Sequence, residues 1–303
     1  MTNHSDDPAL SLEGRVAVVT GAGAGLGRAE ALALARAGAT VVLNDLPGAA
    51  DEAAEEVRSL GGEAVVAAGD VGERSTADAM LAAAVDLGRL DIVVNNAGVL
   101  RDKMLFNMTD EDWDLVLRVH LRGHFLLSRN AAAYWRTTYK ETGEPVYGRV
   151  VNTTSEAFLV GSPGQPNYSA AKAGITALTL STARGLSRVG VRANAIAPRA
   201  RTAMTAGVFG ADESGKAVDP YSPEHVAPLV AYLASPAADR INGQVFVVYA
   251  GMVALLAAPV VEQRFDAAGD TWDLAGLDVS LGGYFKTRDP DLSFAADSVM
   301  TLA

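Results

Sequence analysis

The chain has 303 residues, 49% of them hydrophobic, and carries a net charge of −11 from 25 basic and 36 acidic residues. This length and apolar content suffice for one large core, and the acidic balance argues against nonspecific binding to nucleic acid. The absence of cysteine excludes disulfides and thiolate metal sites. Residues 1–10 lack the layout of a signal peptide, and no apolar run is long enough to cross a bilayer. We therefore expect a cytoplasmic protein that binds neither nucleic acid nor membrane.

Short apolar, β-branched runs alternate with Ala- and Leu-rich stretches along the chain, which is typical of βαβ units around a parallel sheet. In chain order, strands are predicted at Val16–Thr20, Thr40–Asn44, Glu63–Ala67, Asp91–Val94, Val150–Thr153, Val191–Ile196 and Val245–Val248. Helices are predicted at Gly27–Ala37, Ala50–Gly61, Arg74–Leu87, Asp110–Trp135, Ser169–Val189 and Ser222–Ala234. The fold class is therefore α/β, with a single Rossmann-type, doubly wound parallel sheet of seven strands and helices on both faces.

No repeat or low-complexity linker divides the chain. We expect residues 1–256 to form one dinucleotide-binding catalytic domain, with Arg136–Gly148 as a polar insertion before the fifth strand. Residues 257–303 contain aromatics such as Phe265 and Trp272, and are too apolar for a disordered end. They are predicted to form an extension that packs on the same domain or on a neighbouring subunit.

The first predicted strand is followed by a glycine-rich turn that leads directly into a helix. The segment Thr20–Gly27 reads TGAGAGLG. Glycine lets backbone approach a pyrophosphate closely, and the N-terminus of the next helix supplies N–H groups and a partial positive charge. The alternative is a tight turn without a ligand, but the position of this loop in the first βα unit favours a dinucleotide site. We expect Gly21, Gly25, Leu26 and Gly27 to bind the cofactor.

Asp45 follows the second predicted strand, roughly 20 residues after the glycine loop, where an acidic residue meets the adenosine ribose in dinucleotide-binding folds. A carboxylate there accepts hydrogen bonds from the ribose hydroxyls and repels a 2′-phosphate. The next residue is Leu46 rather than a base. Unless Asp45 is an ordinary turn residue, this position favours NAD over NADP as the cofactor.

Three polar residues are candidates for the chemistry. Tyr168 and Lys172 are four residues apart at the start of a predicted helix, so they share a helical face. A nearby ammonium favours the phenolate form of a tyrosine, whose ordinary pKa near 10 makes it a poor base at neutral pH. Ser155 lies at the end of the fifth strand, where its hydroxyl would hold the same substrate oxygen. A Tyr and a Lys at this spacing are common on solvated helices, so the pair alone is a weak signal. In combination with the preceding glycine loop, the pair becomes a specific signal for a catalytic site.

At these residues the chain resembles the short-chain dehydrogenase/reductase family, over roughly Leu12–Met252. The matching pieces, besides the glycine loop, are NNAG at Asn95–Gly98, the serine at Ser155 and YSAAK at Tyr168–Lys172. They occur in the order that the family has.

The resemblance implies a role for each matching residue. Tyr168 would exchange a proton with the substrate oxygen, Lys172 would lower the pKa of Tyr168 and bind the nicotinamide ribose, and Ser155 would orient the reacting carbonyl or alcohol. It also implies cofactor contacts beyond the glycine loop, at Asp70, Val71, Asn96, Ala97, Gly98, Tyr168, Lys172, Pro198 and Thr202.

The chain departs from the family pattern at two places. Most members carry an asparagine in the helix after NNAG, where it supports a water relay, and the corresponding residue here is His120. We therefore include His120 among the catalytic candidates. After the sixth strand the usual Pro-Gly-like stretch reads PRART, which leaves Thr202 as the best candidate for contacting the nicotinamide carboxamide. Arg199 and Arg201 in this stretch either bind a CoA phosphate or are ordinary loop arginines.

The first departure, the histidine in place of asparagine, narrows the class of substrate that we expect. Leu100–Phe125 resembles the 3-hydroxyacyl-CoA dehydrogenase unit of the peroxisomal multifunctional enzyme, which also has a histidine at this position. This implies an enzyme that interconverts a secondary alcohol and a ketone on an acyl-CoA or steroid-like substrate. The alternatives are a 3-oxoacyl-carrier-protein reductase, against which Asp45 argues, and a non-catalytic NAD-sensing protein, against which the retained Tyr168 and Lys172 argue.

Two further expectations concern partners. The helices at Asp110–Trp135 and Ser169–Val189 carry more apolar residues than one side of a sheet requires, which predicts a homo-oligomer, a dimer or tetramer. His120 and His124 are four residues apart but lack a carboxylate at a supporting spacing, so no metal site is expected.

Overall fold

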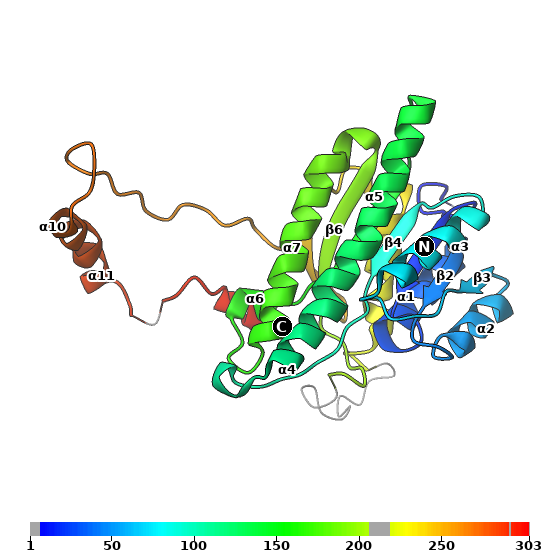
Figure 1. Cartoon of the computed structure of the whole chain (residues 1–303), viewed down its shortest axis with the longest axis horizontal. Coiled ribbons are helices and arrows are strands. Elements are labelled where there is room, and N and C mark those ends of the chain that lie inside the picture. The colour runs from blue at the N-terminus through cyan, green and yellow to red at the C-terminus, as the bar shows by residue number, and fades with distance from the viewer. Residues whose placement is uncertain (1–6, 206–218, 291, 303) are drawn as a thin grey trace. The chain divides into compact units, whose positions relative to one another are not determined.

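A computed structural model describes residues 7–205, 219–290 and 292–302 of the chain. The chain divides into two compact units, Met1–Leu256 and Ala257–Ala303. The larger unit contains the whole sheet and its helices (Figure 1).

The described residues form one sheet of eight strands in the order β3-β2-β1-β4-β5-β6-β7-β8. The strands are β1 (Val16–Thr20), β2 (Thr40–Asn44), β3 (Ala64–Val66), β4 (Ile92–Asn95), β5 (Gly148–Thr153), β6 (Val191–Pro198), β7 (Val245–Tyr249) and β8 (Met252–Leu255). The first seven pair in parallel, which confirms the predicted Rossmann-type sheet.

The eighth strand was not predicted from the sequence. β8 runs antiparallel to β7 after a reversal at Ala250 and Gly251, where Ala250 adopts a left-handed backbone with φ 47°. Its side chains alternate between half-buried and exposed, with Val253 and Leu255 facing solvent. β8 has only four residues and follows β7 closely, so in the sequence it cannot be distinguished from the end of the apolar run that forms β7.

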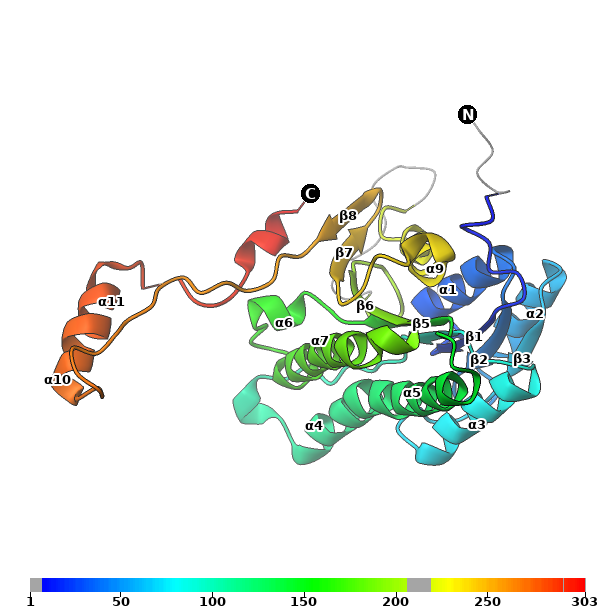
Figure 2. The ribbon, with the colours of Figure 1, turned by 90° about the horizontal axis from the view of Figure 1, so that it is seen from above.

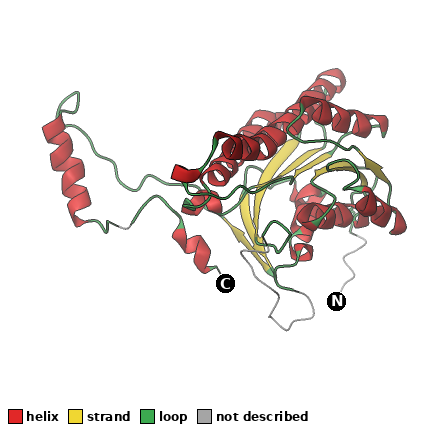
Figure 3. Ribbon diagram, turned by 60° about the horizontal axis from the view of Figure 1, so that its bottom comes forward, coloured by secondary structure: helices red, strands yellow, loops and turns green. Residues whose placement is uncertain are grey.

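Helices cover both faces of the sheet, as Figures 2 and 3 show. One face carries α1 (Gly25–Arg36), α2 (Asp51–Ser59) and α9 (Ala227–Ala234), and the other carries α3 (Arg74–Asp86), α5 (Gly123–Thr142) and α7 (Pro166–Leu186). Each face has its own apolar core. Because the central strands are buried on both sides, their sequences are continuous apolar runs instead of alternating ones.

The long helix predicted at Asp110–Trp135 is interrupted, and it extends further than expected. It consists of α4 (Asp110–Leu117), one π-helical turn η3 (Arg118–Arg122) and α5. α5 continues to Thr142, so the prediction of a polar insertion over Arg136–Gly148 was wrong for most of its length. The last turns of α5 are solvent-exposed, which explains why their polar sequence resembles a loop.

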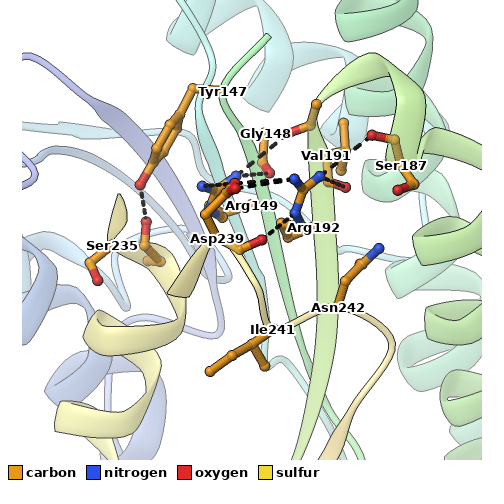
Figure 4. Close-up of polar contacts among 12 residues, drawn as sticks. Tyr147, Gly148, Arg149, Ser187, Val191, Arg192, Ser235, Asp239, Ile241 and Asn242 are labelled. Carbon is orange, nitrogen blue, oxygen red and sulfur yellow. Dashed lines mark hydrogen bonds and ion pairs between the residues drawn. The ribbon is translucent and has the colours of Figure 1, made fainter. Parts of the chain in front are cut away.

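A charged network ties the strands together at the edge where they begin (Figure 4). Arg149 on β5 and Arg192 on β6 are register partners, and both guanidinium groups lie 3.2 Å from the Asp239 carboxylate. The Tyr147 ring lies between Arg149 and Arg15, 4.1 Å and 3.9 Å from their guanidinium carbons. Asp239 thus offsets the repulsion between two cations that would otherwise face each other across neighbouring strands.

The smaller unit contains α10 (Leu274–Leu277), the π-helical turn η7 (Asp278–Gly282), α11 (Gly283–Thr287) and η8 (Asp297–Thr301). Within it Glu262 accepts a hydrogen bond from the Tyr284 hydroxyl at 2.8 Å and pairs with Arg288 at 3.1 Å. The packing of this unit on the catalytic domain or on a neighbouring subunit stays a prediction. Across the described residues, no helix is both long and apolar enough to cross a membrane.

Candidate active site

A cleft of about 470 Å³ opens where the central parallel strands end. Ligands bind at this edge in open α/β sheets, because the loops that follow the strands meet there. Most residues that the sequence singled out line this cleft, namely Gly21, Gly25, Leu26, Asp45, Asp70, Val71, Asn96, Ala97, Gly98, His120, Tyr168, Lys172, Pro198 and Thr202. Gly27 and Ser155 are not among the lining residues: Gly27 packs against Gly21, and Ser155 acts on Tyr168, which does line the cleft.

The glycine loop fits a pyrophosphate. Gly21 and Gly25 have φ of 65° and 55°, a left-handed backbone that favours glycine, and a Cβ on Gly21 would come within 2.9 Å of the Ala97 Cα. α1 begins at Gly25, and its N-cap residue Ala24 provides no side-chain cap. The first N–H groups of α1 are therefore left for a ligand, in a position where the helix dipole favours an anion.

The end of the cleft beside the glycine loop carries two carboxylates, each held by neighbouring groups. Asp45 accepts hydrogen bonds from the Gly23 and Leu46 N–H groups at 2.9 and 2.8 Å, so the carboxylate is fixed beside the glycine loop. Asp70 pairs with Arg118 of η3 at 2.7 Å. Arg118 is a cleft residue that the sequence did not indicate, because nothing in the helical pattern distinguishes it from a solvated arginine.

The segment after β4 is clamped to β1. The N–H groups of Asn96 and Ala97 both donate to the Thr20 hydroxyl, at 3.0 and 3.1 Å, and the Asn96 side chain donates to the Thr20 carbonyl. Gly98 packs against the His120 ring. These contacts fix residues 96–98, which line the cleft between the glycine loop and the catalytic candidates.

Ser155 lies close enough to Tyr168 to act on its hydroxyl. Burial raises the pKa of Tyr168 above its ordinary value, and the Ser155 side chain opposes this rise. The expected lowering of this pKa by Lys172 and a bound oxidised nicotinamide stays a prediction. In the protein alone burial raises the pKa, so the positive charge of the cofactor is an essential part of that expectation.

Lys172 is 2% exposed and donates a hydrogen bond from Nζ to the Thr153 carbonyl at 2.6 Å. Its Nζ lies 5.3 Å from the centre of the Tyr168 ring. Burial lowers the pKa of Lys172 to about 7, and the charge of Glu30 opposes this effect. The ammonium is thus close enough to influence Tyr168, but it holds its proton less firmly than an exposed lysine.

His120 occupies the π-helical turn η3, a feature that often marks functional sites. Its ring stands edge-on to the Tyr168 ring with centroids 5.2 Å apart, and Nε2 lies 2.8 Å from the Val99 carbonyl oxygen and 3.0 Å from the Val99 nitrogen. Burial lowers the pKa of His120 to about 3, so the ring is neutral. No cluster of three or more metal-ligating side chains occurs in the described part of the chain.

The two arginines of the PRART stretch are ion-paired. Arg199 forms two contacts with Glu156, at 2.7 and 2.8 Å, and Arg201 pairs with Asp219 at 2.8 Å. Their charges are therefore largely compensated within the protein. These ion pairs argue against a dedicated binding site for a CoA phosphate at these two arginines.

The fold and the cleft define a class of protein: an oxidoreductase that holds a nicotinamide dinucleotide on a Rossmann-type sheet. A family model for the short chain dehydrogenases matches residues 15–212. The chain therefore belongs to the short-chain dehydrogenase/reductase family, as the sequence motifs implied, and is an enzyme of that family.

Relatives of known sequence or structure agree with this assignment. The chain is 60% identical to the hydroxyacyl-CoA dehydrogenase ChsB1 of Mycobacterium tuberculosis, over 95% of this chain and 94% of the relative. It is 42% identical to the peroxisomal multifunctional enzyme type 2 of Mus musculus, over 82% of this chain but only 33% of that larger protein. A crystal structure of a short chain dehydrogenase from Mycobacterium avium superposes with a TM-score of 0.83 at 41% identity, and the match covers 94% of this chain and 99% of the other.

Proposed function

We propose that this enzyme is an NAD-dependent 3-hydroxyacyl-CoA dehydrogenase, acting on an acyl chain as bulky as a steroid side chain or nucleus. The observation that carries this proposal is the match to ChsB1 at 60% identity over nearly the whole length of both chains. The cleft supports the chemistry, since Tyr168 and Lys172 line it beside a loop suited to a pyrophosphate, and Ser155 acts on Tyr168.

In the proposed oxidation, Ser155 and Tyr168 bind the substrate hydroxyl, and Tyr168 accepts its proton. The nicotinamide ring, when bound, accepts the hydride and contributes a positive charge. Lys172 supports the phenolate of Tyr168 and binds the nicotinamide ribose. His120, neutral and in contact with the Tyr168 ring, is held beside the tyrosine by its hydrogen bond with the Val99 backbone.

A comparison of kcat/KM among alternative substrates tests the proposed substrate class. Wild-type enzyme is assayed with matched 3-hydroxyacyl thioesters of CoA and of acyl carrier protein, and with a free steroid alcohol, each with NAD and NADP. We expect the highest kcat/KM for the CoA thioester with NAD. A preference for the carrier-protein thioester with NADP would instead identify a 3-oxoacyl-carrier-protein reductase.

Asp45 is expected to determine the choice of cofactor. Its carboxylate would repel the 2′-phosphate of NADP, and like charges brought together in an interface cost several kcal/mol. We predict that Asp45→Asn lowers the NAD-to-NADP ratio of kcat/KM at least about tenfold. Asn keeps an oxygen for the Gly23 N–H, whereas Asp45→Ala also releases the loop. Steady-state kinetics with both cofactors measure this ratio, and a wild type that already prefers NADP would refute the argument.

The chain is further proposed to act as a homo-oligomer, a dimer or tetramer. Apolar side chains on the helices expected to associate remain exposed in the single chain, among them Trp113, Phe125 and Leu180. A cytoplasmic location also remains a proposal.

A further inference from the structure

Arg118 lines the cleft, and the proposed reaction leaves it without a role. Its Nη1 lies 2.7 Å from the Asp70 carboxylate and 3.3 Å from that of Glu73. The side chains of Arg118 and Asp70 are 35% and 32% exposed, so a ligand in the cleft can reach both. Ion pairs that are open to solvent contribute little to stability, so folding alone does not account for this pair.

The backbone around Asp70 makes room for the Arg118 side chain. A Cβ on Gly72 would lie 2.6 Å from Nη1 of Arg118 and 2.8 Å from its Cγ, so only glycine leaves the space that this side chain occupies. Four residues further along η3, Arg122 donates a hydrogen bond from Nε to the Gly72 carbonyl at 3.0 Å. One π-helical turn therefore holds the segment after β3 through both a carboxylate and the backbone.

The Asp70 carboxylate is oriented and still has room to accept from a ligand. Oδ1 accepts a hydrogen bond from the Gly72 N–H at 2.8 Å, and Oδ2 lies 2.7 Å from Arg118. A carboxylate has about four acceptor positions, so these two contacts leave about two of them open among the described residues. A fixed acceptor of this kind favours a ligand that presents a donor in the matching direction.

The position of Asp70 indicates which part of the dinucleotide it would meet. The Asp45 carbonyl accepts a hydrogen bond from the Gly69 N–H at 2.8 Å, so the residue expected to bind the ribose adjoins the segment that carries Asp70. Leu46, which is 58% exposed, and Val71 add apolar surface to the same cleft. A base attached to that ribose would meet both apolar side chains and the Asp70 acceptor. Adenine suits this combination because its exocyclic amino group is a donor.

We propose that Arg118 is a positioning residue that gives the cleft its preference for adenine, by holding the Asp70 carboxylate where it accepts from the exocyclic amino group. The proposal rests on the dinucleotide of the proposed function and adds selection of the base to the selection that Asp45 is expected to make at the ribose. Without the guanidinium, Asp70 and Glu73 repel each other with no cation between them. The Asp70 carboxylate then loses its single orientation.

The test compares the Kd of NAD with that of nicotinamide hypoxanthine dinucleotide, in which an oxygen replaces the amino group. We expect wild type to bind NAD at least about threefold more tightly, as one hydrogen bond provides. Arg118→Met should raise the Kd of NAD by about the same factor and leave that of the analogue nearly unchanged. Arg118→Lys keeps the cation and should retain most of the preference. Titration calorimetry measures all four values without turnover.

Two further variants separate the proposed role from a general effect on folding. Gly72→Ala keeps the arginine but places a Cβ where its guanidinium lies, so the preference for adenine should be lost again. The matched control is Arg28→Met, because Arg28 also pairs with two carboxylates, Glu52 and Glu56, and is 32% exposed. Arg28 is not among the residues that line the cleft, so this variant should keep the preference.

Three results would overturn the proposal: an equal loss of affinity for NAD and the analogue in Arg118→Met, unchanged affinities in that variant, or the same loss of preference in Arg28→Met. Gly72→Ala and Arg118→Lys decide the matter if Arg118→Met does not fold. If the preference depends on Arg118 but no 3-hydroxyacyl-CoA is oxidised, the proposed function fails while the role of Arg118 stands.

Discussion

Tyr168→Phe is expected to lower kcat for alcohol oxidation by about 10²–10⁴-fold, the usual contribution of a positioned acid–base group. The substitution removes the hydroxyl on which Ser155 acts and leaves the ring against His120. NAD affinity should change little, because the glycine loop and Asp45 are untouched. We therefore expect the fall in kcat to reflect lost stabilisation of the transition state and not weaker binding of the cofactor.

The energetic demand on Tyr168 is large. In the protein alone burial raises its pKa above the ordinary value near 10. A fall from the ordinary value to near neutral pH is roughly two or three units and corresponds to roughly 3–4 kcal/mol of differential stabilisation, and the rise caused by burial adds to this demand. The Lys172 ammonium and the positive charge of a bound oxidised nicotinamide would together supply it in a partly dehydrated site. We therefore expect the oxidation rate to climb with pH as one group loses its proton.

Turnover and NAD affinity measured in parallel check this prediction. The matched control is Tyr147→Phe, which removes the same atom at the opposite edge of the sheet, where the hydroxyl donates to the Ala234 carbonyl. Retention of more than a tenth of wild-type activity by Tyr168→Phe would place the acid–base group elsewhere.

Lys172→Met is expected to damage both catalysis and cofactor binding. Loss of the ammonium removes support for the Tyr168 phenolate, which should lower kcat by roughly 10²-fold. A hydrogen bond from a charged group to the cofactor ribose is worth about 1.5–3 kcal/mol, so the Kd for NAD should rise about tenfold or more. Met retains most of the side-chain volume, whereas Ala would add a cavity.

The stability of Lys172→Met separates this effect from unfolding. The depressed pKa of Lys172 means that its contribution to stability is lost as pH falls from about 10.5 through about 7. The variant should therefore be at least as stable as wild type at pH 6. We would measure NAD affinity by titration calorimetry, kcat by steady-state kinetics and stability by thermal unfolding. A variant that binds NAD as tightly as wild type would contradict the predicted role of Lys172 in binding the ribose.

The parallel sheet and most of the cleft could be predicted from sequence because local chemistry specifies them. A strand that is buried on both faces needs a continuous apolar run, and the glycine loop needs residues such as Gly21 that adopt positive φ. Tyr168 and Lys172 were placed together by helical spacing alone. Their roles in catalysis remain predictions for the experiments described above.

Features that depend on contacts distant in sequence were missed. Glu30 sits in an Ala-rich helical pattern, and only the packing of α1 on the sheet shows that it is buried. The rise that burial causes in the Tyr168 pKa of the protein alone was likewise missed, because spacing reveals a neighbouring ammonium but not the depth of burial. β8 was missed since an edge strand of four residues has no pattern distinct from the end of β7.

The central claim is that this chain catalyses an oxidation and does not merely bind the dinucleotide. It is tested by incubating wild-type enzyme with NAD and a 3-hydroxyacyl-CoA, and quantifying NADH and 3-oxoacyl-CoA together. We predict equal amounts of the two products over many turnovers, and almost none with Tyr168→Phe. Tight binding of NAD without NADH formation from any secondary alcohol would contradict the account and indicate an NAD-sensing protein.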